Sequence, residues 1–498
     1  MTRATRLAIM ISILAVAARF ILIDQPYIDN WSWRQSDVAA IARNYFQGGF
    51  HFAHPQIDWA GDQPGYVGTE FPILPFLAAL CYKIFAVHEW VGRVQAVFLF
   101  AFSLPFFFLL IRKLFDETSA IWALLYYSFA PVGIMASRCF MPDMPSLAFS
   151  IIGLYFFERW IEAEPDWRSG SSSFFASGLC ISLSILIKLP SAIIGAPLAC
   201  LAVQRFGFSA FRSVRIWAFA AVALLPSAIW YGHAYETALN FYPHHFFGAG
   251  GIKIMSAAWY LKIAKEIVTS TLTPILFVLG GVGAFITTSR SRARLFHWWL
   301  VAMILFVVIV GYGNRHQWYQ LPLVPIAAAF AGHLCAQIMS LPRFARASSF
   351  VALFMRAGFS LVLIAFAACV LASAKILYLP VAAPLRDSGL ELNRVMPPEA
   401  LIVAADNGDP TIFYYAARKG WHFLEKDRIY DGDPRDSGQG IVDLEGLRAR
   451  GASYLVFTSN TVWWLDYYEQ LRQHVEATST LVEATSEFKI YQLNPFPK

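Results

Sequence analysis

The residues of this chain that could do acid–base chemistry are concentrated in one segment. Six carboxylates lie between Asp24 and Glu70, in a chain that is 57% hydrophobic. A carboxylate can accept a proton from a reacting hydroxyl group. Because the segment directly follows the first apolar run, it is either a solvated linker or a reaction site at a membrane face.

The composition places the chain in a lipid bilayer. Only 14% of the residues are charged, 16% are aromatic, and the mean hydropathy is +0.50, which is too apolar for an ordinary soluble domain. Residues 380–498 carry 17 acidic and 12 basic residues, so the basic excess of the chain lies in its apolar part. This distribution is typical of membrane-topology determinants and not of nucleic-acid binding, so we expect no nucleic-acid partner.

Uncharged segments that could cross a hydrocarbon core of about 30 Å recur through residues 1–379. We predict eleven spans, at about residues 7–23, 94–111, 118–136, 144–161, 172–188, 189–204, 215–235, 267–289, 295–313, 317–340 and 357–378. The first follows Arg3 and Arg6, and we expect it to remain as an anchor and not to be cleaved as a signal peptide.

The distribution of Arg and Lys predicts the orientation. If the short apolar segment from Pro72 to His88 does not cross, the clusters of basic residues all fall on one side of the membrane. We therefore predict that this segment lies along the surface and that the first outer loop runs from residue 24 to about residue 90. The N-terminus is then cytoplasmic, and residues 380–498 are on the outer side.

Short elements are expected outside the spans. In the outer loop, Val38, Ile41 and Tyr45 repeat at helical spacing, with Ser36 or Asp37 as the cap and Gly48-Gly49 at the end. A third surface helix is predicted near residues 256–268. The tail, residues 380–498, has β-type runs at 400–404, 454–458 and 488–493, with helical stretches at 410–418 and 444–450 between them. This pattern predicts a small α/β domain.

Several runs, taken together, resemble a known family. The chain is similar to the GT-C fold glycosyltransferases that use polyprenyl-phosphate sugars, which include protein O-mannosyltransferases and the aminoarabinose transferases of lipid A. The resemblance covers roughly residues 1–340. It rests on the order and spacing of four runs, which are Trp33 to Asn44, Glu70 to Leu74, Ser137 to Met144 and Arg315 to Pro322.

The resemblance implies a polytopic α-helical membrane protein with residues 1–379 as a GT-C domain. The α/β domain at 380–498, which the charge distribution places outside the cytoplasm, follows it. It implies an inverting glycosyltransferase on the outer face of a bacterial inner membrane. The donor would be a polyprenyl-phosphate-linked sugar, and the acceptor an envelope glycan, lipid or protein.

The catalytic base departs from the family pattern. Such transfer needs a base for the acceptor hydroxyl and cations for the departing phosphate. The family's base is an Asp soon after the first span, often followed by Glu, but here Arg34 and Gln35 occupy those two places. The base then moves to Asp37, our first choice, or Asp29, our second. Helix capping by Asp37 and turn hydrogen bonding by Asp29 are the competing interpretations.

Other polar residues receive supporting roles. Glu70, Asp143 and Arg34 are expected to support the site. The residues expected to meet the donor phosphate are Arg138, Lys188, Arg315, His316 and Tyr319; mutual ion pairing, snorkelling to headgroups and an aromatic belt are their structural alternatives.

No cofactor is required by these residues, although Glu70 with His244 and His245 could bind a divalent metal ion. The remaining loop carboxylates, Asp24, Asp58 and Asp62, are expected to be solvated.

Two other functions compete with sugar transfer. A transporter or flippase of a lipid-linked precursor would place ionisable residues at mid-membrane and show repeated halves, whereas this chain concentrates its acids in outer loops. A non-catalytic subunit of envelope assembly is the other alternative, because the Asp-Glu signature is altered.

Overall fold

The computed structural model describes residues 2–163, 167–242, 251–286, 290–342, 350–426 and 429–496. The chain forms two compact units. The first consists of Met1–Ile23, Arg93–Trp230 and Ala249–Leu377, and the second of Asp24–Gly92, Tyr231–Gly248 and Tyr378–Lys498. The second unit therefore combines the first outer loop with the C-terminal tail.

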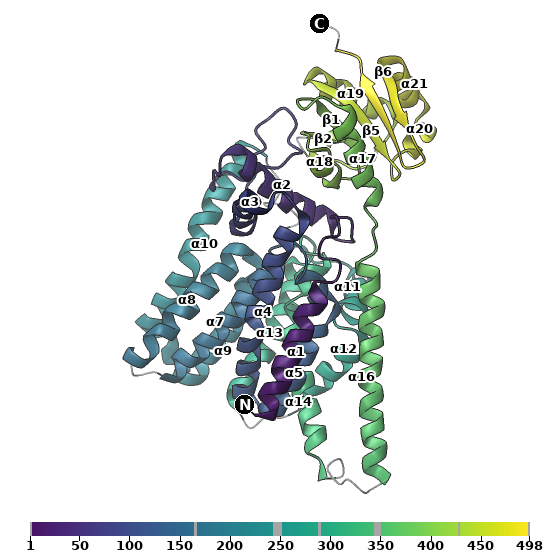
Figure 1. Cartoon of the computed structure of the whole chain (residues 1–498). Helices are drawn as coiled ribbons and strands as arrows, with labels where there is room; N and C mark the ends of the chain where they lie inside the picture. The colour runs from purple at the N-terminus through teal and green to yellow at the C-terminus, as the bar shows by residue number, and fades with distance from the viewer. Residues whose placement is uncertain are drawn as a thin grey trace. The chain divides into compact units, whose positions relative to one another are not determined.

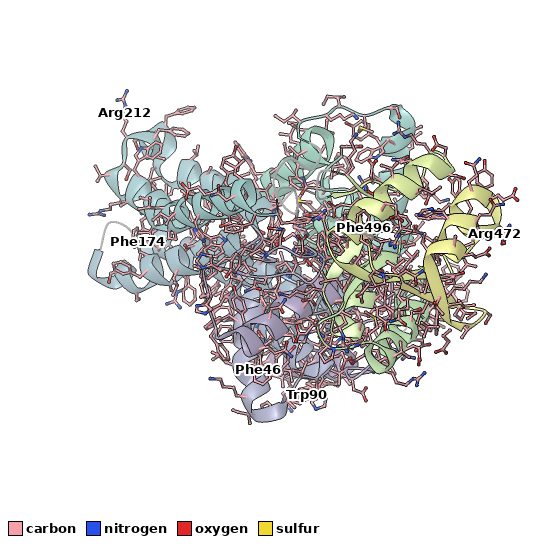
Figure 2. The ribbon with its side chains drawn as sticks, turned by 90° about the horizontal axis from the view of Figure 1, so that it is seen from above. Phe46, Trp90, Phe174, Arg212, Arg472 and Phe496 are labelled. Carbon is pink, nitrogen blue, oxygen red and sulfur yellow. The ribbon has the colours of Figure 1, made fainter. Side chains whose placement is uncertain are left out.

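The first unit is helical (Figure 1). Its elements are α1 (Arg3–Arg19), most of α4 (Glu89–Leu114), α5 (Glu117–Phe129), α6 (Pro131–Ala136), α7 (Asp143–Ala163), α8 (Trp167–Ile187), η1 (Leu189–Ile194), α9 (Gly195–Phe206), η2 (Gly207–Arg212), the first part of α10 (Val214–Asn240), α11 (Ala257–Glu266), η3 (Ile267–Thr271), α12 (Pro274–Ala284), η4 (Ser291–Arg294), α13 (Leu295–Val310), η5 (Gln317–Gln320), α14 (Leu323–Ser340) and α16 (Phe350–Leu377). Arg212, at the end of η2, extends away from these helices (Figure 2).

Within the described residues, seven helices are long and apolar enough to cross a membrane, or eight if one bent pair is a single span. These cover eight of the eleven predicted spans. The other three segments are also helical, but α1 has 17 residues, α5 has 13, and α7 carries Glu158 and Arg159 among its apolar residues. The structure thus shows a polytopic helical protein, and the count of eleven crossings stays a prediction.

The predicted span at 267–289 is broken. The helical stretches Ala257–Thr271 and Pro274–Ala284 meet at an angle of 105°. A short π-helix, η3, precedes the break, and Pro274 cannot donate the hydrogen bond that would continue the first helix. The side chain of Thr273 caps the new helix by accepting from the amide of Leu276. The helix predicted near residues 256–268 is present as α11, which Ser256 caps, and its place at the membrane surface stays a prediction.

Small residues allow the central helices to approach closely. A Cβ atom on Gly283 of α12 would lie 2.2 Å from the carbonyl oxygen of Phe330 on α14, and one on Gly332 would lie 2.5 Å from that of Ser119 on α5. Lipid supplies no hydrophobic force between helices, so close backbone packing stabilises such contacts. Helix α14 is consequently buried between α5 and α12.

The outer loop in the second unit contains the two expected helices, α2 (Ser32–Gly48) and α3 (Ile73–Phe85). Helix α3 is too short to cross a bilayer, as predicted. The end of α2 is also as predicted, because Gly49 has the left-handed conformation with φ of 98°. Its start is not: the helix begins at Ser32, and no side chain caps it, so Ser36 and Asp37 lie inside the helix.

The tail of the second unit is an α/β fold, as predicted. Its elements are α17 (Ala383–Val395), β1 (Leu401–Ala405), α18 (Thr411–Ala416), β2 (Gly420–His422), β3 (Glu425–Lys426), β4 (Ile429–Tyr430), α19 (Ser437–Ala449), β5 (Ala452–Thr458), α20 (Trp463–Tyr467), α21 (Glu469–Thr478), β6 (Ser479–Ala484) and β7 (Phe488–Leu493). The main sheet has the order β2-β1-β5-β7-β6, with β2, β1 and β5 parallel and the β5–β7 and β6–β7 pairs antiparallel.

Both faces of this sheet are covered, so its central strands read as continuous apolar runs. Val403 and Leu455 pack with α19, α20 and α21 on one face, while Ile402 and Val456 pack with α17 and α18 on the other. The polar loop that follows β1 therefore lies at the carboxyl ends of parallel strands, where α/β folds commonly place functional residues.

Candidate functional site

Two charged residues of α2 form a buried cluster with Glu70, which lies in the loop before α3. The Arg34 guanidinium places Nη1 2.8 Å from Oδ2 of Asp37 and Nη2 2.6 Å from Oε1 of Glu70. Thr69 donates its hydroxyl proton to the other oxygen of Glu70 at 2.7 Å. The three charged residues are 7% exposed or less, and Asp37 is fully buried. The structure therefore brings together our first-choice base and both expected supporting residues of the loop.

Asp29, the second-choice base, lies just before α2. Its Oδ1 accepts from the amide of Trp31 at 3.0 Å and from Nε2 of Gln35 at 2.8 Å, and its carbonyl accepts from the amide of Ser32. The residue is fully buried. These are the turn hydrogen bonds of the structural alternative, so Asp29 shapes the chain where α2 begins.

One of the three carboxylates expected to be solvated is not. Asp58 is 3% exposed, receives hydrogen bonds from Arg43 at 2.6 Å and Asn44 at 2.9 Å, and lies beside the α2 helix. The positive charge of Arg43 on α2 compensates the cost of burying the Asp58 carboxylate. Asp24 is exposed, and Asp62 lies 3.0 Å from Arg450 of the tail.

In the first unit, a second charged group joins residues that are far apart in the sequence. Nζ of Lys188 lies 2.7 Å from Oδ1 of Asp143 and 4.2 Å from the ring centre of Tyr319. Lys188 follows α8, Asp143 begins α7, and Tyr319 belongs to η5. Lys188 is 5% exposed and Asp143 is 4% exposed. A lysine beside a phenol at the end of membrane helices is suited to holding a phosphate group.

The other expected phosphate ligands are placed differently. Arg138 is fully buried, and its guanidinium donates to the carbonyl of Leu22 at the end of the first helical segment. Arg315 is exposed, with its guanidinium 5.9 Å from the ring centre of Tyr312. His316 stacks on Trp318 at 4.6 Å between ring centres, which fits the aromatic-belt alternative.

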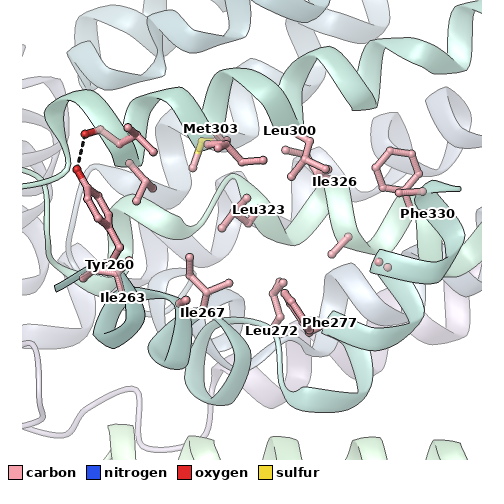
Figure 3. Close-up of a pocket in the computed structure, with 18 residues that line it drawn as sticks. Tyr260, Ile263, Ile267, Leu272, Phe277, Leu300, Met303, Leu323, Ile326 and Phe330 are labelled. Atoms are coloured by element: carbon pink, nitrogen blue, oxygen red, sulfur yellow. Dashed lines mark hydrogen bonds between the residues drawn. The ribbon is translucent and has the colours of Figure 1, made fainter. Parts of the chain in front are cut away.

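An apolar cavity of about 440 Å³ lies in the first unit between α11, η3, α12, α13 and α14. Its walls include Ile267, Phe277, Met303, Leu323 and Phe330, whose side chains surround the space (Figure 3). At one end Tyr260 donates its hydroxyl proton to the carbonyl of Val308 at 2.8 Å. Leu323, in the cavity wall, is four residues after Tyr319, whose ring contacts Lys188. The cavity is therefore close in sequence to the Lys188 group.

The tail contributes polar residues that the sequence analysis missed. Asp406, at the end of β1, is fully buried and accepts from Nδ1 of His422 at 2.8 Å. Burial raises the pKa of Asp406, although His422 opposes this shift. Burial also raises the pKa of Asp409 to about 6, and the charge of Asp406 acts in the same direction. The run Asp406 to Thr411 directly after an apolar strand was the signal that could have identified these residues.

The predicted metal site of Glu70, His244 and His245 gains no support from the described residues. Within the described ranges, no group of three His, Cys, Asp or Glu residues could hold a metal ion. Glu70 is bound to Arg34 and Thr69. His244 and His245 lie outside the described residues, so the metal site remains a prediction.

Comparison with known proteins agrees with this architecture. The family model described as dolichyl-phosphate-mannose-protein mannosyltransferase matches residues 62–231. No curated protein matches the chain by sequence. Among solved structures, the chain is similar to ArnT from Cupriavidus metallidurans in the apo state, with 15% identity, a TM-score of 0.67 and coverage of 98% of both chains.

Two further solved structures are similar. ArnT from Cupriavidus metallidurans bound to undecaprenyl phosphate has 14% identity, a TM-score of 0.64 and coverage of 97% of both chains. The Archaeoglobus fulgidus oligosaccharyltransferase in its apo form has 13% identity and a TM-score of 0.62, with 92% of this chain and 70% of that chain covered.

The chain is therefore a multi-pass membrane protein with the GT-C fold and a small C-terminal α/β domain. This fold class is the predicted one.

Proposed function

We propose that this protein is an inverting membrane glycosyltransferase. It would move a sugar from a polyprenyl-phosphate donor to an envelope glycan, lipid or protein acceptor at the outer face of a bacterial inner membrane. The observation that carries the proposal is the buried group that Arg34 and Asp37 of α2 form with Glu70, in a chain with the fold of ArnT. A fold alone does not define an activity, so the argument rests on what these residues can do.

The proposed reaction is a single displacement at the anomeric carbon. A carboxylate takes the proton of the acceptor hydroxyl while that oxygen forms its bond to the sugar. The bond between the anomeric carbon and the phosphate oxygen breaks on the opposite side, and the lipid phosphate leaves with the electron pair. Asp37 is our first choice for the base, because Arg34 fixes its carboxylate while Glu70 shares the charge of that guanidinium. Asp29 is the second choice.

The donor side of the proposal rests on the first unit. Lys188 and Tyr319 would bind the departing phosphate, whose developing charge needs a cation in a site with little water. Asp143 would hold Lys188 in place. The apolar cavity beside α14 would take isoprene units of the lipid, since a wall of aliphatic and aromatic side chains matches a hydrocarbon chain. A solved relative in fold is described as bound to undecaprenyl phosphate.

The base assignment is tested with Asp37→Asn and Asp29→Asn, which keep the side-chain size and remove the charge. We expect the variant that lacks the base to insert and fold normally but to lose sugar transfer in membranes by at least about 100-fold. Full activity in both single variants and in the double variant would contradict the assignment. Mass analysis of lipid-linked sugars that accumulate without the protein would identify the donor.

The orientation is part of the proposal and has its own test. Reporter fusions after residue 65 and after residue 430 should both be on the outer side, because these positions follow the first predicted span and the last one. A fusion at residue 430 that reports from the cytoplasm would contradict the orientation and, with it, the outer-face reaction.

A further inference from the structure

Helix α2 has two functional faces. Ser32, Ser36 and Arg43 are separated by four and seven residues, so they lie in one stripe along the helix. Arg34 lies on the opposite side and Asp37 lies about 100° around the helix from Ser36, since each residue turns the helix by about 100°. The face with Asp37 belongs to the charged cluster described above. The stripe of Ser32, Ser36 and Arg43 faces the tail.

The start of α2 is hydrogen-bonded to the loop after β1. The hydroxyl of Ser32 donates to Oδ2 of Asp409 at 3.2 Å, and the other carboxylate oxygen accepts from the amide of Thr411 at 3.0 Å. The hydroxyls of Ser36 and Thr411 lie 3.1 Å apart. Asp409 thus links the start of α18 to the start of α2, and Thr411 repeats the link one turn later.

The far end of the stripe is held as well. Arg43 donates to the carbonyl of Tyr414 in α18, and its guanidinium lies 4.7 Å from the Tyr414 ring centre. Ser36 and Thr411 are fully buried, Ser32 is 3% exposed and Arg43 is 8% exposed. Buried hydrogen bonds of this kind are costly to break, because each group that loses its partner keeps its desolvation cost. Rotation of α2 about its axis would break all three contacts.

We propose that Asp409 and Thr411 of the tail are positioning residues for sugar transfer, because they fix the rotation of α2 and therefore the place of Asp37. The C-terminal domain then holds the helix that carries the base in one orientation. This inference rests on the proposed function. A base must be held within a fraction of an ångström of its working position, and such precision comes from residues behind it.

The test uses Thr411→Val, which keeps the shape of the side chain and removes its hydroxyl, and Asp409→Ala, which removes both acceptors. We expect the double variant to lower kcat by about 10- to 100-fold while KM for the donor changes by less than about twofold. The single variant Thr411→Ser keeps the hydroxyl, so it should retain most of the kcat of the unmodified protein. Asp436→Ala is the matched control, because Asp436 is an exposed Asp that caps α19 in the same domain.

Hydrogen–deuterium exchange of the intact protein gives a readout that does not depend on activity. Amides of α2 should exchange faster in the Thr411→Val and Asp409→Ala double variant and should be unchanged in Asp436→Ala. Unchanged exchange in α2, or a kcat equal to that of the unmodified protein, would overturn the positioning role. Full activity of Asp37→Asn and Asp29→Asn would instead refute the proposed base, so the two failures are distinguishable.

Discussion

Arg34 lies 2.8 Å from Asp37, three residues later on the same helix turn, and its second nitrogen binds Glu70 at 2.6 Å. One guanidinium therefore binds two buried carboxylates from different segments of the loop. A direct ion pair thus joins Arg34 to the residue that is our first choice for the base.

Replacement of Arg34 should lower both the stability and the activity of the protein. Arg34→Met leaves Asp37 and Glu70 close together without their cation, and removal of one partner from a buried ion pair costs about 3–5 kcal/mol. We expect a lower melting temperature in detergent and no sugar transfer. Arg34→Lys should recover part of the stability but little activity, because one ammonium cannot make the same two directed contacts. A melting temperature unchanged by Arg34→Met would contradict the structural role of the cluster.

Replacement of Lys188 should reduce kcat/KM for the lipid-linked sugar donor. Lys188→Met removes the cation beside Tyr319 and leaves Asp143 buried without its ion-pair partner, so we expect a loss of kcat/KM for lipid-linked sugar of about 100-fold or more. The double variant Lys188→Met/Asp143→Asn should be more stable than Lys188→Met, because it removes the uncompensated charge. Melting curves and steady-state kinetics of the three proteins separate stability from phosphate binding. Normal kinetics in Lys188→Met would exclude the phosphate role.

Replacing a glycine in the wall of the apolar cavity with a larger residue tests whether the cavity binds the lipid. A Cβ on Gly281 meets no atom within 4 Å, although Gly281 lines the cavity. Gly281→Leu should therefore fill part of the space without backbone strain. We expect KM for a long-chain polyprenyl donor to rise about 10-fold, with little change for a donor of one or two isoprene units. Gly358→Leu on α16 is the control, since its Cβ also meets open space and the residue is not in the cavity wall. Equal effects on both donors would argue against a lipid site.

The contribution of Asp443 to the stability of the tail should fall as the pH rises from about 4 to 7. Burial raises the pKa of Asp443 to about 6 from its ordinary value of 3.8, and the charges of Glu425 and Asp431 act in the same direction. The folded tail therefore binds this proton more tightly than the unfolded tail does. Stability is highest below the unfolded pKa and falls until the folded pKa is passed.

The same carboxyl provides the variant that checks this pH dependence. Asp443 is partly exposed, so we expect a change of only about 1–2 kcal/mol after solvent screening. Asp443→Asn should stabilise the protein at pH 7 and leave its stability at pH 4 nearly unchanged, as measured by thermal unfolding. Stabilisation of equal size at both pH values would contradict the assignment.

Local patterns in the sequence predicted many elements correctly. Among the described residues, the apolar runs identified seven segments that form membrane-type helices, or eight if the bent pair is one span. Such runs are informative because a segment in a bilayer must satisfy its own backbone hydrogen bonds. The runs at 400–404, 454–458 and 488–493 became β1, β5 and β7. The start of α2 was wrong by five or six residues, because Ser36 or Asp37 was taken as the cap, whereas the cap position is Trp31. At the observed start, the amide of Ser32 donates to the carbonyl of Asp29 and its hydroxyl donates to Asp409.

The sequence by itself determined a polytopic helical protein, an acidic loop after the first apolar run, a small α/β tail and the residue types that could react. Periodicity and hydropathy act over a few neighbouring residues, so they carry this information. Only the tertiary structure decided the pairing of charges. It joined Arg34 to Glu70, Lys188 to Asp143, and Ser32 to Asp409 across 377 positions. Such partners are selected by burial, since a charge or polar group removed from water must find its compensation wherever the fold brings one.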